Sequence, residues 1–450
     1  MNLVYGIKDK PKFGQLILFA IQQLLAIMAA TIAVPRIVGN GMSQTAALFG
    51  AGVGTIVYLL FTKFRSPVFL GSSFAFLGSM STAFAGAVSM ELGYLGLIVG
   101  AFLAGLVYVV IAVVVKICGV KWIDKLMPAV VIGPTVAIIG LSLSGNAISD
   151  LFTGNVTKVV DGVSTQCASV YVCLICGLVA LGVTMLCSVF GKKLIKMIPF
   201  IIGILAGYAV AAVFTLIGNS AGIDAFKVIN FELFNTMQWI PDFTFVNAVK
   251  GIDDMSASYF ATIAVAYVPV AFVVFAEHIA DHKNLSTIID TDLLNDPGLH
   301  RTLLGDGVGS MAGAIFGGCP NTTYGESVGC VAISGNASVV TILATAILAM
   351  LISFFGPFAT FLATIPSCVM GGVCVSLYGF IAVSGLKMIQ DVDLNENHNL
   401  FVVCVILIAG VGGMTVSFGQ VTITEVACAL ILGILTNIML SGKKSEEESK

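Results

Sequence analysis

Fourteen apolar stretches, each bounded by turn-forming or charged residues, follow one another along this 450-residue chain. A helix needs about 20 apolar residues to cross the hydrocarbon core of a bilayer, and most of these stretches approach that length. Only 10% of the residues are charged, whereas soluble domains carry roughly 25%. The sequence therefore predicts an all-α polytopic membrane protein. The stretches lie near residues 15–35, 44–62, 66–83, 92–117, 127–148, 168–190, 197–218, 256–280, 302–318, 324–334, 337–358, 364–386, 399–414 and 421–441.

Lysine and arginine are distributed unevenly between alternate loops. If the N-terminus is cytoplasmic, seventeen of them lie in the termini and in the loops after even-numbered stretches, and four lie in the other loops. Because cytoplasmic loops carry such an excess, the pattern predicts an even number of crossings with both termini in the cytoplasm. The seventeen are Lys8, Lys10, Lys12, Lys63, Arg65, Lys116, Lys121, Lys125, Lys192, Lys193, Lys196, Lys283, Arg301, Lys387, Lys443, Lys444 and Lys450, and the four are Arg36, Lys158, Lys227 and Lys250.

Two of the stretches are interrupted by proline and small polar residues. The third begins "SPVFLGSSFAF" (residues 66–76), and the tenth begins "CPNTTYGES" (residues 319–327). They lie seven stretches apart, an odd number, so the two halves of the chain would cross the membrane in opposite directions. Matched interruptions in an inverted repeat mark the central binding site of a secondary transporter. Irregular backbone at that depth is tolerated where protein or a cavity surrounds it.

Acidic residues within an apolar stretch are costly, by roughly 2.5–3.5 kcal/mol on insertion scales, so their first interpretation is functional. Glu277 ends a long apolar run in "YVPVAFVVFAEHIADH", and Asp281 follows four residues later, about one helical turn along the same face. Because like charges disfavour simultaneous ionisation, the pair can gain and lose a proton, as a proton-coupled carrier requires. The alternatives are that Asp281 caps the helix end or faces cytoplasmic water, and that Glu277 is a hydrogen-bonded structural acid.

A third acid, Glu326, lies in the interrupted tenth stretch beside Gly325. The glycine leaves room for a ligand to approach the backbone, so its N–H can donate to a ligand carbonyl while the carboxylate accepts from a ligand N–H. The edge of a pyrimidine or purine presents this alternation. Phe74, in the third stretch, offers a ring for stacking and a further N–H, although helix packing is its alternative role. Glu91 and Glu425 also lie within apolar stretches.

Histidine and cysteine pairs raise the question of a metal site. His278 and His282 have a spacing that can bind zinc, but the run between them, "HIADH", lacks the glutamate of zinc proteases, which leaves an intramembrane metal hydrolase as a remote alternative. Cys173 and Cys176 form a single C-x-x-C in an apolar stretch and are predicted to be buried small residues. No metal or other cofactor is expected. A purely structural scaffold would not need acids in interrupted segments, and no basic patch indicates nucleic acid.

The run over residues 277–329 closely resembles the matching region of bacterial uracil permeases, which belong to the nucleobase–ascorbate transporter (nucleobase:cation symporter-2) family. The motifs "AEH", "DPGLHR" and "NTTYGE" occur there in this order. The runs "QQLLAIMAATIAVP" (residues 22–35), "GSSFAF" (residues 71–76) and "PSCVMGGVCVSLYG" (residues 366–379) fit as well. The resemblance extends over nearly the whole chain.

The resemblance implies a fold of fourteen transmembrane segments in two inverted repeats of seven, with short β-stretches that pair where segments 3 and 10 meet. A core domain that holds the substrate would comprise residues 15–117 (segments 1–4) and 256–358 (segments 8–11). A gate domain would comprise residues 127–218 (segments 5–7) and 364–441 (segments 12–14). Members of the family look dimeric through the gate domain, so a homodimer is expected.

The resemblance also implies which residues bind the substrate. Two carboxylates, Glu277 and Glu326, would hold the base, and the backbone amides of Phe74 and Gly325 would face its carbonyls. Further residues would line the site or belong to its supporting network. Those that line it are Ala30 and Tyr324, and those that support it are Gln23 and Tyr378.

Two positions depart from the family pattern. Uracil permeases commonly carry histidine one turn after the first glutamate, where this chain has Asp281 and the histidine is displaced to His282. The "QH" of relatives is Gln22–Gln23 here. Purine-type members often have aspartate at the position of Asp281, but they usually have glutamine or asparagine in place of Glu326. A carboxylate at Glu326 suits a ligand that presents ring N–H groups, as uracil does.

These features together predict a symporter that imports uracil with protons by alternating access across a bacterial inner membrane. Glu277 would carry the coupled proton, and Asp281 would adjust the pKa of Glu277. The partners expected are uracil, protons and the lipid bilayer. A xanthine or urate permease of the same fold is the alternative.

Overall fold

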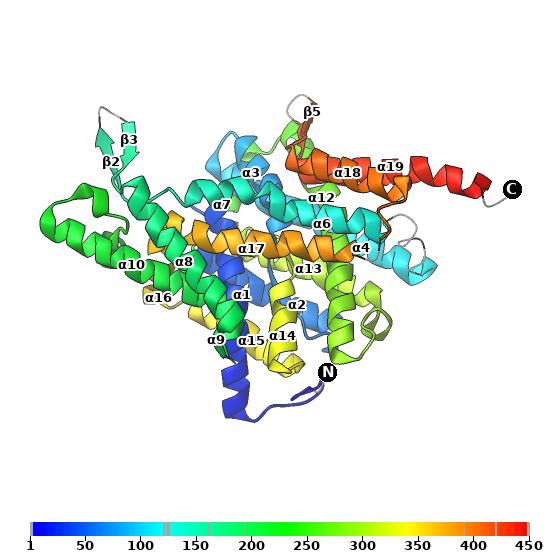
Figure 1. Ribbon diagram of the computed structural model, residues 1–450, viewed down its shortest axis with the longest axis horizontal. Coiled ribbons are helices and arrows are strands. Elements are labelled where there is room, and N and C mark those ends of the chain that lie inside the picture. Colours follow the sequence, from blue (N-terminus) through cyan, green and yellow to red (C-terminus); the bar gives the residue numbers. More distant parts are fainter. Residues whose placement is uncertain are drawn as a thin grey trace.

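Helices make up almost all of the structure, which is a computed structural model (Figure 1). It describes residues 3–119, 122, 127–160, 163–192, 194–390, 392–418 and 421–447. Within these ranges the strands form three two-stranded ribbons. Four lysines that enter the charge pattern, Lys121, Lys125, Lys193 and Lys450, lie outside the described residues.

In the first half of the chain, every predicted apolar stretch coincides with a helix or with a strand followed by a helix. The fifth stretch is interrupted at Leu143, so that it forms two helices in succession. A strand hairpin of β2 (Thr157–Val160) and β3 (Val163–Gln166) precedes the sixth. The elements are α1 (Phe13–Val38), α2 (Gln44–Phe61), β1 (Leu70–Ser72) with η1 (Phe74–Phe76) and α3 (Leu77–Ala85), α4 (Met90–Cys118), α6 (Ala129–Ser142) with α7 (Ser144–Asp150), α8 (Val170–Phe190), and α9 (Leu194–Met197) with α10 (Pro199–Ala221).

The second half repeats this order, again with one interrupted segment third in the series. Two boundaries differ from the prediction. The eleventh stretch ends at Ile352, and the chain bends by 84° into a further helix that begins with a Gly-Pro pair. The fourteenth begins with a strand, and its helix starts at Glu425. The elements are α12 (Ala257–Ile289), α13 (Leu299–Gly317), β4 (Asn321–Thr323) with α14 (Gly325–Ser334), α15 (Val339–Ile352), α16 (Gly356–Thr364), α17 (Ser367–Met388), α18 (Asn397–Val411), β5 (Val416–Phe418) with β6 (Val421–Ile423), and α19 (Glu425–Glu447).

The apolar character of the helices matches a multi-pass membrane protein. Among the described residues, eight helices are long and apolar enough to cross a bilayer, and the bent pair α15–α16 gives a ninth. Shorter apolar helices occupy residues 74–85, 397–411 and 425–441. The predicted all-α membrane fold is therefore present, while fourteen as the number of complete crossings stays a prediction.

The two interrupted segments meet in the middle of the molecule. Strand β1 pairs antiparallel with β4, and Gly71 lies opposite Thr322 at the centre of the ribbon. A side chain at Gly71 could not be accommodated, because a Cβ atom there would lie 2.3 Å from the ring of Tyr324. One extended residue, Ser73 after β1 and Tyr324 after β4, separates each strand from the short helix that follows it. The predicted β-stretches are confirmed.

Segments at corresponding positions of the two halves pack against each other. Helix α2 packs along α13, and α6 packs along α17. Glycine permits the first of these contacts, because a Cβ atom at Gly50 would lie 2.4 Å from the carbonyl oxygen of Gly313. Most other contacts fall within two sets of helices. The first set contains α1, α2, α3, α4, α12, α13, α14 and α15, and the second contains α6, α8, α10, α17, α18 and α19.

Contacts between loops agree with the prediction that successive loops alternate between the two sides of the membrane. Near the N-terminus, the amides of Val4 and Tyr5 donate to the carbonyl of Gly335, in the loop after the tenth segment. Arg65, after the second segment, pairs with Asp296, after the eighth. The pattern predicts a cytoplasmic location for all of these positions, and they come together in space. In Figure 1 the N-terminal stretch runs below α14.

Candidate functional site

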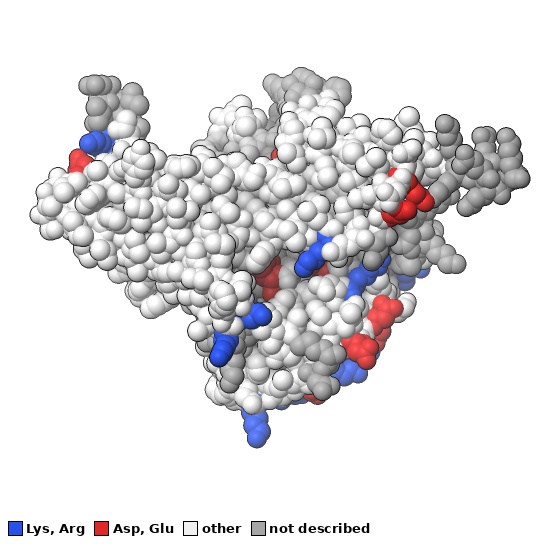
Figure 2. Space-filling model, in the orientation of Figure 1, with Lys and Arg blue, Asp and Glu red and all other residues white. Residues whose placement is uncertain are grey.

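A polar cavity of about 330 Å³ lies where the β1–β4 ribbon meets the second set of helices. Three acidic side chains from two elements, Glu277, Asp281 and Glu326, line it together. In Figure 2, acidic atoms are visible in a hollow of the surface that lies between α17 and α14 in the view of Figure 1. The other lining residues include Ser73, Phe74, Lys196, Asn284, Thr322, Tyr324, Gly325, Gly329, Cys330 and Ile333.

One end of the cavity is formed by the start of α14. Gly325 is the first residue of this helix and is exposed to the cavity, and Glu326 follows it. The first N–H groups of a helix have no acceptor within the helix and carry a partial positive charge. A Cβ atom at Gly325 would meet only the Oδ1 atom of Asp281, at 3.8 Å. The backbone here is therefore open to a ligand, with donors and a carboxylate acceptor side by side.

A second helix start faces the same cavity. Phe74 begins η1 two residues after the end of β1, and its side chain is buried with its ring at 5.6 Å from the ring of Tyr378. The two rings make an edge contact between the two sets of helices, since Tyr378 belongs to α17. Tyr324 closes the other side, where its hydroxyl donates to the carbonyl of Ser72 at 2.7 Å. The cavity thus has an aromatic wall beside its polar end.

Helix α12 contributes the remaining acids. Glu277 and Asp281 line the cavity with partly buried side chains. The Oδ2 atom of Asp281 accepts a hydrogen bond of 2.8 Å from Thr323 Oγ1 in β4. The helix continues for eight residues beyond Asp281, to Ile289, so the alternative that Asp281 caps the helix end is wrong. The structure instead fixes its carboxylate against the strand ribbon.

Gln23 supports the site from α1. Its Nε2 atom donates to Ser327 Oγ at 2.6 Å, and Ser327 Oγ accepts from the amide of Phe69 at 3.0 Å. Both side chains are buried. One serine therefore joins α1, the segment before β1, and the first turn of α14. Gln23 holds the half-helix that carries Glu326 and does not line the cavity itself.

The remaining positions singled out from the sequence lie away from the cavity. Ala30 is buried in α1, four residues beyond Ala26, which does line the cavity. Glu91 and Glu425 lie in the first turns of α4 and α19, where a helix N-terminus favours an acid. Cys173 and Cys176 are both fully buried, as expected.

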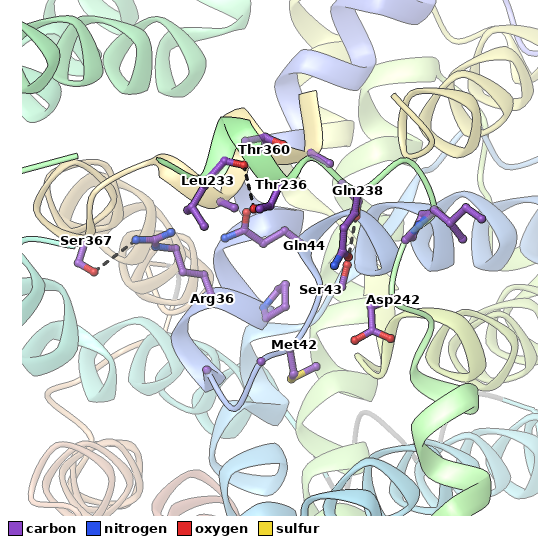
Figure 3. Close-up of a pocket in the computed structure, with 18 residues that line it drawn as sticks. Arg36, Met42, Ser43, Gln44, Leu233, Thr236, Gln238, Asp242, Thr360 and Ser367 are labelled. Atoms are coloured by element: carbon purple, nitrogen blue, oxygen red, sulfur yellow. Dashed lines mark hydrogen bonds between the residues drawn. The ribbon is translucent and has the colours of Figure 1, made fainter. Parts of the chain in front are cut away.

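A second cavity, of about 540 Å³, lies on another part of the molecule (Figure 3). It is formed by the end of α1, the start of α2, the segment around residues 233–242 and α16. It shares no lining residue with the acidic cavity. The loops around it are those after odd-numbered segments, so the charge pattern predicts that it faces outward. It contains none of the acids discussed above.

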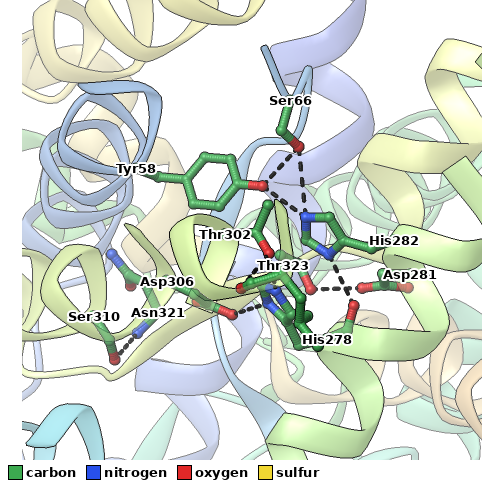
Figure 4. Close-up of polar contacts among 11 residues, drawn as sticks. Tyr58, Ser66, His278, Asp281, His282, Thr302, Asp306, Ser310, Asn321 and Thr323 are labelled. Atoms are coloured by element: carbon green, nitrogen blue, oxygen red, sulfur yellow. Dashed lines mark hydrogen bonds and ion pairs between the residues drawn. The ribbon is translucent and has the colours of Figure 1, made fainter. Parts of the chain in front are cut away.

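The two histidines of α12 belong to a buried polar network behind the cavity (Figure 4). His278 Nδ1 lies 2.6 Å from Asp306 Oδ2, and its Nε2 atom lies 3.0 Å from Thr302 Oγ1. His282 Nδ1 donates to the carbonyl of His278 at 2.8 Å, and its Nε2 atom lies 2.7 Å from Tyr58 Oη. All four ring nitrogens therefore have partners within the protein. Among the described residues no group of three or more histidine, cysteine or acidic side chains is placed to hold a metal ion.

Asp306 is the polar residue of this region that the sequence reasoning missed. It lies in α13, is 1% exposed, and pairs with His278. The signal was available, because Asp306 interrupts the apolar run of the ninth stretch just as Glu277 interrupts the eighth. Its partner could not be read from the chain, because α12 and α13 are brought together only by the fold.

Comparison with known proteins identifies the family. The sequence profile described as "Permease family" matches residues 14–418. The chain belongs to this permease family. It is 37% identical to the uracil permease of Bacillus caldolyticus over 99% of this chain and 96% of that protein. It is 37% identical to the uracil permease of Bacillus subtilis (98% and 96%) and 33% identical to that of Escherichia coli K12 (95% and 92%).

Solved structures show the same fold in more distant transporters. The transmembrane domain of the cyanobacterial bicarbonate transporter BicA superposes with a TM-score of 0.62 at 15% identity, covering 96% of this chain and all of that domain. The murine anion transporter Slc26a9 in its inward-facing state gives a TM-score of 0.64 at 14% identity, covering 97% of this chain and 69% of that one. The family match and the uracil permease relatives show that the protein is a membrane transporter and not an enzyme, and they confirm the resemblance to the uracil permeases.

Proposed function

We propose that this permease carries uracil, and that the acidic cavity is its substrate site. The single observation that carries the proposal is the start of α14, where the open backbone of Gly325 stands beside the carboxylate of Glu326. Uracil presents alternating ring N–H and carbonyl groups on its edge, which this pair complements. The relatives named uracil permease match the chain over nearly its whole length. A single-ring base also fits within 330 Å³.

The arrangement suggests how the base is held. The carboxylate of Glu326 accepts from a ring N–H, and the amides of Phe74 and Gly325, at the starts of η1 and α14, donate to the ring carbonyls. The two helix N-termini supply positive partial charges on the carbonyl side. Phe74 and Tyr324 line the same space and offer aromatic faces to the ring. Glu277 completes the polar end from α12.

Proton coupling is the second part of the proposal. Glu277, Asp281 and Glu326 share one cavity, and three neighbouring carboxylates do not all carry charge at once in a partly dry site. A proton taken up by Glu277 would lower the negative charge when the base binds and would leave with it. Asp281 adjusts this step from its fixed position beside Thr323. Movement of protons down their gradient would then drive import.

Alternating access would come from two bodies moving against each other. The proposed core contains residues 15–117 and 256–358, and the proposed gate contains residues 127–218 and 364–441. Support comes from the packing, which is dense within each set of helices and sparse between them. The acidic cavity lies at the boundary, since Glu326 belongs to the first set and Phe380 and Ser384 to the second. Movement of the two sets of helices against each other at this boundary would open the site to one side of the membrane at a time.

The orientation proposed is that of a bacterial inner-membrane protein with both termini in the cytoplasm. The lysine and arginine distribution supports it, as do the contacts between loops of the same predicted side. The acidic cavity is lined at one end by Lys196 and Asn284, which lie toward predicted cytoplasmic loops. The conformation would then be inward-facing. We also propose a homodimer through the gate domain, by resemblance to the family.

A purine is the second candidate substrate, and Asp281 is the observation that favours it. Its carboxylate lines the cavity where uracil permeases commonly have histidine. Competition separates the two: unlabelled xanthine, urate and uracil are each tested against labelled uracil on purified protein. Displacement by uracil alone supports the first proposal. Displacement by xanthine or urate at lower concentration than uracil overturns it.

Transport itself is tested in proteoliposomes with labelled uracil and an imposed pH gradient, acid outside. Uptake above equilibrium that disappears when a protonophore collapses the gradient is expected. Uptake above equilibrium that persists without the pH gradient contradicts proton coupling. If such uptake requires sodium, sodium is the coupled ion instead. The variant Glu277→Ala should retain its fold and lose concentrative uptake.

A further inference from the structure

Arg36 joins the two sets of helices at a point distant from the acidic cavity. It lies in the last turn of α1, and its Nη2 atom donates to Asn155 Oδ1 at 3.2 Å and to Ser367 Oγ at 3.4 Å. Ser367 begins α17, which belongs to the second set, and Asn155 lies in the loop after α7, which packs against α17. Figure 3 shows the bond between Arg36 and Ser367 at the edge of the second cavity.

The two acceptors form one rigid unit. Asn155 Oδ1 also accepts from the amide of Ser367 at 3.0 Å, and its Nδ2 atom donates to the carbonyl of Ile365 at 2.9 Å. The amide of Asn155 donates in turn to the carbonyl of Val228. The start of α17 and the loop after α7 therefore move together. If this unit withdraws from α1, Arg36 loses both bonds at once.

The position of Arg36 along α1 places it on the far side of the substrate site. Ala26 lines the acidic cavity and Arg36 lines the second cavity, ten residues further along the helix. At 1.5 Å per residue this is a separation of about 15 Å. The residues between them are packed, since Ala30 and Ala33 are each 1% exposed. The second cavity therefore ends at a closed layer, and Arg36 stands at its edge.

The hydrogen bonds of Arg36 to Asn155 and Ser367 can be broken and remade in each transport cycle. Among the described residues no carboxylate lies within ion-pair distance of its guanidinium; Asp150 attracts it from farther away. Both acceptors are neutral, so separation leaves no buried carboxylate without a partner. The cation is also favoured at the C-terminal end of a helix. A hydrogen bond from a charged donor is nevertheless among the stronger contacts available here.

We propose that Arg36 is a positioning residue that holds the outer side of the transporter closed while the acidic cavity is open to the other side. The inference rests on the proposed alternating access. Opening the outer side requires the end of α1 to leave the start of α17, and the Arg36 bonds oppose that movement. Loss of the guanidinium favours the outward-open state. Arg36 makes no contact with the substrate and changes the balance between the two states.

The test measures access to two reporter cysteines in purified, substrate-free protein. Gly329→Cys reports the acidic cavity, where a Cβ atom meets nothing within 4 Å, and Ala33→Cys reports the closed layer in α1. A small charged thiol reagent is applied, and the labelled residue is located by fragment-ion mass spectrometry, which separates Gly329→Cys from the adjacent native Cys330 and from the other ten native cysteines. Arg36→Met is expected to raise labelling at Ala33→Cys by about tenfold and to lower it at Gly329→Cys.

The matched control is Arg65→Met, which removes an arginine that pairs with Asp296 on the opposite side. It should leave labelling at both positions unchanged. If Arg36→Met does not fold, Ser367→Ala removes one acceptor instead. It should also raise labelling at Ala33→Cys and lower labelling at Gly329→Cys, by smaller factors. Equal labelling in the variant and the parent protein overturns the inference. Because the readout needs neither uracil nor protons, a failed uptake experiment would not produce that result.

Discussion

Asp281 in α12 accepts a hydrogen bond from Thr323 in β4, with 2.8 Å between Oδ2 and Oγ1. This bond connects the helix that carries the proposed proton site to the ribbon that positions the proposed substrate site. Thr323 lies two residues before Gly325, so a change in the charge of Asp281 acts close to the base-binding backbone. The contact gives proton uptake and substrate binding a shared element.

Replacement of Thr323 by valine tests this connection. Valine keeps the shape of threonine and removes the donor, which leaves the buried side of Asp281 without its partner. The variant should lose about 1 kcal/mol of stabilisation from this hydrogen bond, and the rate of uracil uptake should fall about fivefold. Thr323→Ser keeps the hydroxyl and should transport at nearly the parent rate. Equal uptake by the valine and serine variants would show that the bond has no part in transport.

Glu326→Gln should lose most of its affinity for uracil. The amide of glutamine presents a donor toward a ligand N–H that needs an acceptor, and such a mismatch costs about 1–3 kcal/mol. Equilibrium binding of labelled uracil to detergent-purified protein measures the change. Glu425→Gln is the control, since this acid lies in the first turn of α19 and outside the cavity. Near-normal affinity in Glu326→Gln means that the site lies elsewhere.

Two glycines of the ribbon region should respond in opposite ways. A side chain at Gly325 enters open space toward Asp281, so Gly325→Val should fold with an unchanged unfolding temperature and lose uracil binding. A side chain at Gly71 meets the ring of Tyr324 at 2.3 Å, so Gly71→Ala should lower the free energy of unfolding by about 1–3 kcal/mol. Thermal unfolding and uracil binding are measured on both variants. Retained binding in Gly325→Val contradicts the proposed approach of the base to the backbone.

Much of the site could be predicted because its residues break local rules. Pro320 and the polar run after it do not suit a membrane helix, and they form the strand and helix start seen here. Glu277 and Glu326 were identifiable because an acid in an apolar stretch is costly. The hydrogen bond from Thr323 to Asp281 could not be predicted, because it joins residues 42 positions apart. The partner of Gln23 could not be predicted for the same reason, since Ser327 lies in another segment.

The pair of His278 and Asp306 allows a last prediction, which separates a structural role from a role in proton transfer. Both side chains are at most 1% exposed and outside the acidic cavity, with 2.6 Å between Nδ1 and Oδ2. Asp306→Ala leaves a buried imidazole without its partner and should lower the free energy of unfolding by about 1–3 kcal/mol. Asp306→Asn keeps an acceptor and should recover part of that loss.

Thermal unfolding of the purified protein measures the effect, and Asp253→Ala, at an exposed position, is the control. Variants that fold should still bind uracil, because Asp306 does not line the cavity. If Asp306→Asn is instead as stable as the parent protein and binds uracil but no longer accumulates it, the residue belongs to the proton route. In that case Thr302 and Tyr58, the other partners of the two histidines, become the next positions to vary.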